Sequence, residues 1–364
     1  MGNGNINPNC LLESRVRTLK WERHVLKLID QRKLPFKETY VNCKSAAGVA
    51  KAIKDMVVRG APAIGVAAGY GVALAALEFK GKDKEKFTGH INENIKLLSG
   101  ARPTAVNLFW ALNRMKKVLA TSSNLEIGKI KDKLIEEARE IERQDLEINW
   151  KIGQNGKKIF EKEKSKIKIL THCNAGALAT SGYGTALAVI RSLNAEGKVA
   201  NVIVDETRPL VQGARLTAWE LHQEKIPFFI IADNMAGYFM SRGDVDAVLV
   251  GADRIASNGD VANKIGTLSL SILARYYRIP FYIAAPISTV DIKIGSGDNI
   301  PIEYRNKKEV RVVLGKTIIP EFMAVENPAF DVTQAGNITA IITEDGIIYP
   351  PYKRNIGKIF KSKR

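Results

Sequence analysis

The spacing of apolar and polar residues differs between two parts of the chain, and it changes near residue 160. Before it, apolar residues recur every three or four positions, as at Ile127, Ile130 and Leu134. This spacing predicts two or three long amphipathic helices over 104–160. After it, short apolar runs alternate with longer mixed segments.

The region before the long helices has a mixed pattern. Val25, Leu26 and Leu28 alternate with polar residues, which predicts a small β region within Arg15–Val41. From residue 45 to 80 the apolar spacing is helical, and "VRGAPAIG" interrupts it. We therefore expect a mostly helical N-terminal domain with a small β-sheet.

Five apolar runs follow: "KIKILTH", "NVIVDE", "PFFIIAD", "AVLVGAD" and "PFYIAAP". Near-continuous apolar runs are typical of parallel strands buried on both faces, and their alternation with helical segments indicates a doubly wound sheet. The predicted fold class is α/β, with a smaller helical domain at 1–160 and a Rossmann-like parallel α/β domain at 161–364. The lysine-rich "EKEKSKIK" at 161–168 is the expected boundary.

Composition narrows the class of protein. Hydrophobic residues make up 45% and charged residues 26% of 364, which is ordinary for a soluble globular protein. No apolar run reaches about 18 residues, and the first residues lack a signal-peptide pattern. The three cysteines, Cys10, Cys43 and Cys173, are widely spaced, which favours free thiols in a reducing compartment. We expect a cytoplasmic protein without membrane contact.

The formal net charge is +17. The lysines occur in runs, and acidic residues are interleaved in the two internal ones. We interpret these runs as solvated helix faces and a basic end, because a nucleic-acid reader would carry a recognisable motif. Nucleic acid is therefore not an expected partner, although the positive field would attract an anionic substrate.

Polar residues crowd the predicted carboxyl ends of the five strands, where ligands bind in sheets of this kind. Cys173 follows the first strand at a turn rich in glycine and alanine, and a helix starting nearby would favour its thiolate. Asp253 ends the fourth strand, where partial desolvation would suit a general acid. The alternatives are a buried structural thiol for Cys173, and a helix cap or a salt bridge to Arg254 for Asp253.

Several residues suggest binding of a phosphate. Lys264, after Asn263, stands where a helix is expected to begin, a position that suits a cation only if an anion binds there too. Its alternative is a solvent-facing lysine. Arg59-Gly60-Ala61-Pro62 and Arg102-Pro103-Thr104 each place an arginine just before an expected helix. An arginine there can form a bidentate contact with phosphate.

The sequence does not match the binding motifs of nicotinamide dinucleotides or of metal ions. The glycine pair of "SGYGTAL" lies too far beyond the strand for a dinucleotide turn, and Leu187 stands where the third small residue is needed. The four histidines are scattered without ligand spacing. We expect neither a nicotinamide cofactor nor a metal.

The blocks "RGAPAIGVAAGYG", "THCNAGALATSGYGTALAVI", "VDETRPLVQGARLTAWEL" and "VLVGADRIASNGDVANKIGT" resemble the S-methyl-5-thioribose-1-phosphate isomerase family. The similarity covers nearly the whole chain, from about Arg15 to Tyr349. It implies an aldose–ketose isomerase of methionine salvage that acts on a sugar phosphate without a cofactor, as a cytoplasmic homodimer.

The resemblance also implies roles for single residues. Asp253 would be the proton donor and Cys173 the second catalytic residue. The implied substrate-binding residues are Arg59, Gly60, Ala61, Arg102, Gln212, Asn263 and Lys264. Two related readings stay open: a ribose-1,5-bisphosphate isomerase with the same catalytic pair, and a non-catalytic regulatory subunit of the initiation-factor exchange complex.

Overall fold

The computed structural model describes residues 15–102 and 106–362. Cys10, Pro103 and Thr104, which the sequence singled out, lie outside the described residues. The chain divides into two compact units, each described here by itself. Unit 1 comprises Met1–Ile148 and Ala177–Gly184, and unit 2 comprises Asn149–Gly176 and Thr185–Arg364.

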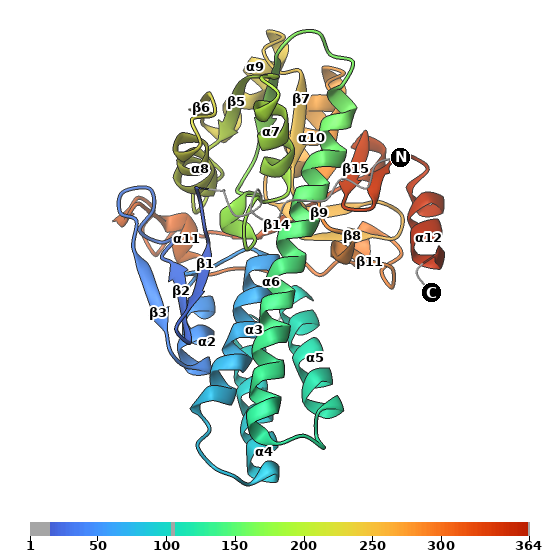
Figure 1. Cartoon of the computed structure of the whole chain (residues 1–364). Helices are drawn as coiled ribbons and strands as arrows, with labels where there is room; N and C mark the ends of the chain where they lie inside the picture. The colour runs from blue at the N-terminus through green and yellow to red at the C-terminus, as the bar shows by residue number, and fades with distance from the viewer. Residues whose placement is uncertain (1–14, 103–105, 363–364) are drawn as a thin grey trace. The chain divides into compact units, whose positions relative to one another are not determined.

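Unit 1 combines a small antiparallel sheet with long helices, as predicted (Figure 1). The sheet strands are β1 (Leu19–Glu22), β2 (Val25–Ile29) and β3 (Tyr40–Cys43). The helices are α2 (Ala46–Lys54), α3 (Ala61–Glu78), α4 (Lys84–Ser99), α5 (Val106–Thr121) and the first part of α6 (Ile127–Lys157). Helix α4 was not predicted from the sequence.

Helix α3 is the centre of unit 1 and packs against α2, α4 and α5. By length and apolar composition alone it could cross a membrane, but 78% of it is buried inside the protein, as in the core helix of a globular domain. Small residues allow the close packing. A Cβ on Gly65 would lie 2.8 Å from the Asn107 carbonyl oxygen of α5, and one on Gly69 would lie 3.3 Å from Ile141 Cδ1 of α6.

Unit 2 is built on a seven-stranded sheet in its described residues, with the order β16-β15-β10-β7-β4-β5-β6. The strands are β4 (Ile167–Thr171), β5 (Val199–Asp205), β6 (Phe228–Ile231), β7 (Ala247–Val250), β10 (Phe281–Ala284), β15 (Ala340–Thr343) and β16 (Gly346–Ile348). All neighbours pair in parallel except β16, which is antiparallel to β15. The predicted Rossmann-like sheet is confirmed, and the strand order reverses between β4 and β7.

The main helices of unit 2 follow these strands, as a doubly wound fold requires. They are α7 (Ala186–Ala195), α8 (Ala218–Gln223), α9 (Ala236–Ser241), α10 (Thr267–Tyr276) and the C-terminal α12 (Tyr352–Ser362). Two shorter elements matter for the site: the 3-10 helix η2 (Ala177–Ala179), which belongs to unit 1, and the π-helix η3 (Gly213–Thr217).

A second sheet in unit 2 was not predicted. Its strands, in spatial order, are β11 (Val290–Asp291), β8 (Arg254–Ala256), β9 (Val261–Lys264) and β14 (Phe330–Thr333). The sequence suggested that a helix begins at Lys264, which is wrong. Lys264 ends a strand, and α10 begins only at Thr267 because Asn263 and Lys264 pair with Asp331 and Phe330 of β14. Beyond this sheet, the short helix α11 (Lys308–Arg311) leads into the hairpin β12 (Val312–Val313) and β13 (Lys316–Thr317).

The unit boundary lies inside α6 and not at the lysine-rich segment after it. The last part of α6 belongs to unit 2 because two glycines let it pack closely on α7. A Cβ on Gly153 would lie 2.6 Å from Ser192 Oγ and 2.7 Å from the Ala188 carbonyl oxygen, and one on Gly156 would meet Val189. Helix α6 therefore begins in unit 1 and ends in unit 2, packed against α7.

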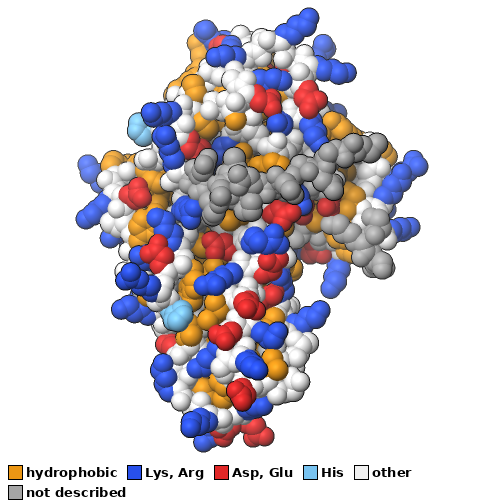
Figure 2. Space-filling model, in the orientation of Figure 1, with side chains coloured by type: hydrophobic (Ala, Val, Ile, Leu, Met, Phe, Trp, Pro, Cys, Tyr) orange, Lys and Arg blue, Asp and Glu red, His pale blue; other side chains and the backbone are white. Residues whose placement is uncertain are grey.

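The high positive charge is distributed over the surface. Figure 2 shows lysine and arginine side chains scattered over the visible face of each unit, with acidic side chains among them. This distribution agrees with the interpretation of the lysine runs as solvated faces.

Candidate active site

Cys173 lies two residues beyond the end of β4, at the point where the strand order of the sheet reverses. Its side chain is buried, and its backbone adopts the left-handed conformation, with φ of 61°. For a residue with a Cβ this conformation costs about 1–3 kcal/mol and is maintained by its surroundings. Here the Cys173 amide donates to Thr207 Oγ1 at 2.7 Å, and its carbonyl accepts from Thr217 Oγ1 at 2.5 Å.

Asp253 follows β7, which is the sheet neighbour of β4. The ends of the two strands are in close contact, since a Cβ on Gly251 would lie 2.8 Å from Ala175 Cβ. The predicted catalytic pair therefore follows adjacent strands at the topological switch point, where α/β sheets bind ligands. The main chain of Asp253 is fixed by its amide, which donates to the Ala262 carbonyl at 2.9 Å.

The side chain of Asp253 is exposed, which contradicts the partial desolvation inferred from its place after an apolar strand. The reason is that β7 ends at Val250, so Asp253 already lies in the connection to β8 and beyond the buried layer. The suggested salt bridge to Arg254 is replaced by another pair, because Arg254 Nη1 lies 3.6 Å from Asp291 Oδ2.

Asn263 and Lys264 are both buried at the end of β9. Asn263 Nδ2 donates to Thr267 Oγ1 at 3.1 Å. Lys264 Nζ donates to the Ala329 carbonyl at 3.0 Å and lies 4.7 Å from the centroid of the Phe330 ring. The alternative of a solvent-facing lysine is therefore wrong. A buried ammonium requires acceptors, and a bound anion would supply further ones.

Gln212 comes directly before the π-helix η3 and is buried. Gly213 packs so tightly against the end of β5 that a Cβ would overlap the Asp205 carbonyl oxygen. This close approach holds Gln212 at the carboxyl edge of the sheet. Among the described residues Gln212 Oε1 has no hydrogen-bond partner, so it can accept a hydrogen bond from a ligand hydroxyl.

The remaining predicted residues belong to unit 1. Arg59, Gly60 and Ala61 lie at the start of α3, and Arg102 lies shortly before α5. The contact of Gly65 with Asn107 places these two helix starts side by side. Gly60, with φ of 91°, is pressed against the backbone of Ala179, so packing alone already requires glycine there.

His172, Asp205 and Asp233 are among the polar residues that the sequence places at the strand ends, but it did not reveal their contacts near Cys173. His172 Nδ1 lies 3.0 Å from Asp205 Oδ2, and its Nε2 lies 2.9 Å from the Ile265 carbonyl oxygen. Asp233 accepts from the amides of Thr207 and Arg208, both at 2.7 Å. Long-range contacts of this kind leave no local signal in the sequence.

His172, Asp205 and Asp233 bring three potential metal ligands within 4.8 Å of one another. Most of their atoms are already used in hydrogen bonds: both ring nitrogens of His172, Oδ2 of Asp205 and both oxygens of Asp233. Of these side-chain atoms, Asp205 Oδ1 alone has no hydrogen-bond partner among the described residues. We interpret the group as a buried ionic network that links β4, β5 and the turn after β9.

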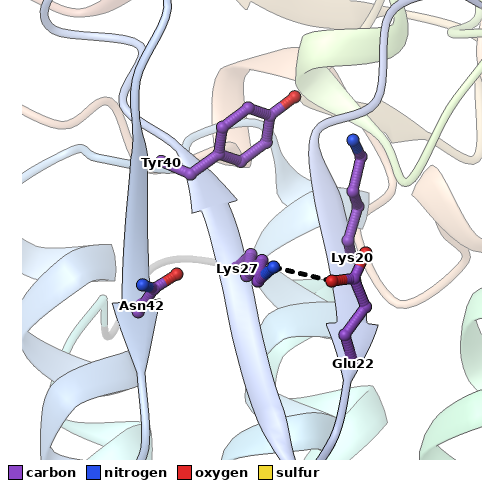
Figure 3. Close-up of a pocket in the computed structure, with 5 residues that line it drawn as sticks. All are labelled: Lys20, Glu22, Lys27, Tyr40 and Asn42. Atoms are coloured by element: carbon purple, nitrogen blue, oxygen red, sulfur yellow. Dashed lines mark hydrogen bonds and ion pairs between the residues drawn. The ribbon is translucent and has the colours of Figure 1, made fainter.

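A shallow pocket lies elsewhere, on the small sheet of unit 1 (Figure 3). Lys20, Glu22, Lys27, Tyr40 and Asn42 line it, and Lys27 Nζ pairs with Glu22 Oε2 at 2.6 Å. It contains none of the predicted site residues, and its ion pair is solvent-exposed, so we assign it no function.

The chain is similar to known proteins over nearly its whole length. Residues 57–350 match the model of the initiation factor 2 subunit family. A methylthioribose-1-phosphate isomerase of Caldicellulosiruptor saccharolyticus is 54% identical over 94% of this chain and 99% of its own. The crystal structure of 5-methylthioribose 1-phosphate isomerase from Pyrococcus horikoshii is 44% identical, with a TM-score of 0.92 over 98% of this chain and 99% of that one.

A second solved structure is described as translation initiation factor eIF-2B, subunit delta, from A. fulgidus. It is 42% identical, with a TM-score of 0.86 over 95% of this chain and 99% of that one. Both similarities extend over nearly the full length of the chains compared. The chain therefore belongs to the initiation factor 2 subunit family and, within it, to the methylthioribose-1-phosphate isomerases.

Proposed function

We propose that the chain converts S-methyl-5-thio-α-D-ribose 1-phosphate to S-methyl-5-thio-D-ribulose 1-phosphate, as an aldose–ketose isomerase of methionine salvage. The observation that carries this function is the 54% identity to a protein of that name over nearly the whole length. The position of Cys173 and Asp253 after adjacent strands at the switch point supports it.

Asp253 is the proposed general acid. The anomeric carbon of the substrate carries phosphate, so the ring cannot open by loss of an anomeric proton. A proton donated by Asp253 to the ring oxygen allows the bond between that oxygen and carbon 1 to break, which leaves an electron-deficient carbon 1. Because Asp253 is exposed, the bound substrate itself must shield it from water. General acid assistance typically contributes about 10²–10⁴-fold.

Cys173 is the proposed second catalytic residue, for transfer of hydrogen from carbon 2 to carbon 1. Two routes balance. In one, a Cys173 thiolate removes the carbon 2 proton and an enol forms; the Cys173 thiol then returns a proton to carbon 1, and the enol hydroxyl gives its proton to the Asp253 carboxylate as the ketone forms. In the other, hydride moves directly from carbon 2 to carbon 1, and the carbon 2 hydroxyl loses its proton as the ketone forms. Reaction in D₂O distinguishes them, because only the first route places deuterium on carbon 1.

The substrate-binding residues are proposals as well. Arg59, Arg102 and Lys264 carry the positive charge that a phosphate needs. Gln212 and Asn263 offer amide groups for sugar hydroxyls, and Gly60 and Ala61 offer main-chain groups. These assignments rest on the family resemblance and on the burial of Gln212, Asn263 and Lys264.

A non-catalytic initiation-factor role is the second candidate, favoured by the 42% identity to the structure described as an eIF-2B subunit. The experiment is to offer the purified chain S-methyl-5-thioribose 1-phosphate and ribose 1,5-bisphosphate separately and to measure ketose formation. We expect product from the first. Product from ribose 1,5-bisphosphate alone would identify that compound as the substrate. Product from neither compound would favour the non-catalytic initiation-factor role.

The cytoplasmic location and the homodimeric state remain predictions from the resemblance. Sedimentation equilibrium of the purified chain tests the homodimeric state directly, because a homodimer has twice the mass of 40.1 kDa expected for one chain.

A further inference from the structure

Two threonines contact the two peptide groups on either side of Cys173 from distant parts of the chain. Thr207 follows β5 and is 34 residues away, and Thr217 ends the π-helix η3 and is 44 residues away. Both threonines are fully buried, with exposed fractions of 0%. A buried hydroxyl keeps its place only where its proton and its lone pairs are used.

Each hydroxyl is used fully. Thr207 Oγ1 accepts from the Cys173 amide at 2.7 Å and donates to the Asp205 carbonyl at 3.0 Å. Thr217 Oγ1 donates to the Cys173 carbonyl at 2.5 Å and accepts from Asn174 Nδ2 at 3.2 Å. One hydroxyl therefore orients the amide of Cys173 and the other its carbonyl.

The surroundings also hold the threonines themselves. The amide of Thr207 donates to Asp233 Oδ1 at 2.7 Å, and Thr207 has φ of 64°, so it shares the left-handed conformation of Cys173. Asn174, which contacts Thr217, also donates to Glu220 Oε1 at 2.8 Å, and Glu220 is buried. The two contacts are thus anchored on β5, on the loop after β6 and on α8.

We propose that Thr207 and Thr217 are positioning residues that hold the backbone of Cys173 in its left-handed conformation and so aim the thiol for the reaction. Neither hydroxyl needs to touch the substrate. Their effect acts through Cys173, because release of either peptide group lets the residue relax toward an ordinary conformation with negative φ and turns its side chain. This inference rests on the proposed function only where turnover is measured.

The test compares Thr207→Val and Thr217→Val, which keep the shape and remove the hydroxyl, with Thr207→Ser and Thr217→Ser, which keep the hydroxyl. We expect kcat to fall by on the order of 10–100-fold in the valine variants with little change in KM, because a small misplacement of a reacting group is costly. The serine variants should retain most of the wild-type kcat.

A second readout needs no turnover. Iodoacetamide labelling followed by peptide mass spectrometry measures the reactivity of Cys173 itself. The other described cysteine, Cys43, is buried, and burial raises the pKa of its thiol to about 11, so it labels slowly. We expect the buried Cys173 to label at least severalfold faster in the valine variants and at the wild-type rate in the serine variants.

Thr343→Val is the matched control. Thr343 is another fully buried threonine, and its hydroxyl donates to the Gly346 carbonyl at 3.0 Å, in β15 away from Cys173. We expect its kcat and its Cys173 labelling to equal the wild type. If a valine variant does not fold by circular dichroism, the alanine variant at the same position replaces it.

Unchanged kcat and labelling in folded Thr207 and Thr217 variants would overturn the inference. Equal losses in the serine and valine variants would overturn it too, because the hydroxyl would then not be the cause. If the wild type shows no isomerase activity, the proposed function fails, while the labelling comparison still decides the positioning role.

Discussion

His172, the residue before the candidate catalytic cysteine, forms a buried pair with Asp205, with His172 Nδ1 at 3.0 Å from Asp205 Oδ2. His172 Nε2 faces a second acceptor, the Ile265 carbonyl oxygen, at 2.9 Å. With Asp205 ionised, both ring nitrogens face acceptors, so we assign His172 as an imidazolium that donates from both. The pair links the strand that precedes Cys173 to the turn that follows Lys264.

The charged pair has a consequence for stability. Burial lowers the pKa of His172, but its hydrogen bond to Asp205 and the charge of that residue outweigh this effect, so that the pKa is raised. Burial also raises the pKa of Asp205, to about 6, although His172 opposes the shift. Because both ring nitrogens face acceptors, we assign protonated His172 facing ionised Asp205 near neutral pH. Asp233 and Asp331 are the other carboxylates that act on the imidazolium.

A group whose pKa is raised on folding stabilises the protein fully below its unfolded pKa, about 6.5 for histidine, and loses that contribution as the pH rises through the folded pKa. We therefore expect the difference in Tm between the wild type and His172→Asn to shrink as the pH rises from about 6.5 upward. His222, which is exposed, provides the control His222→Asn, for which we expect a Tm close to that of the wild type. A difference between wild type and His172→Asn that stays constant with pH would show that the ring is neutral.

Gly153 in α6 tests the close packing on α7. An added Cβ would lie 2.7 Å from the backbone carbonyl oxygen of Ala188, which cannot move aside as a side chain can. Gly153→Ala should therefore lower the free energy of unfolding by about 1–3 kcal/mol, measured by urea denaturation. Gly89→Ala in α4, where nothing lies within 4 Å of the new methyl group, should instead raise it by up to about 1 kcal/mol. Equal effects at the two positions would contradict the packing described for α6.

Arg191 on α7 is a buried cation shared by two carboxylates of the α8 region. Its Nη2 lies 2.6 Å from Glu220 Oε2 and its Nε lies 2.6 Å from Glu224 Oε2. Arg191→Met leaves the buried Glu220 carboxylate without the Arg191 cation, so we expect a loss of about 3–5 kcal/mol in the free energy of unfolding. Arg143→Met removes an arginine that is 61% exposed and paired with Glu140 and Glu147, and should cost at most about 1 kcal/mol. Comparable losses in the two variants would mean that burial of Glu220 is unimportant.

The sequence predicted the elements whose pattern is local. The near-continuous apolar runs of β4, β5, β6, β7 and β10 made these strands recognisable, and the helical spacing of α5 and α6 was equally plain. Lys264, the last residue of β9, was mistaken for the start of a helix because β9 is defined by pairing with β14, far along the chain. Helix α4, whose composition is strongly polar, was overlooked.

Some residues of the candidate site could be predicted from local sequence, and others could not. Cys173 and Asp253 could be selected because both follow recognisable strands, and the strand order then places those strands side by side. The exposure of Asp253 could not be foreseen, because it depends on where the strand stops. The contacts of Thr207 and Thr217 with Cys173 could not be foreseen, because they join residues 34 and 44 positions apart.

The most direct test of the catalytic account is the turnover of S-methyl-5-thioribose 1-phosphate by the purified wild type, Asp253→Asn and Cys173→Ser, measured as ketose product. We expect the wild type to form product, and each variant to lose at least about 100-fold in kcat while its Tm stays close to the wild-type value. Wild-type rates in either variant would remove that residue from the mechanism, and absence of product with the wild type would contradict the proposed isomerase function itself.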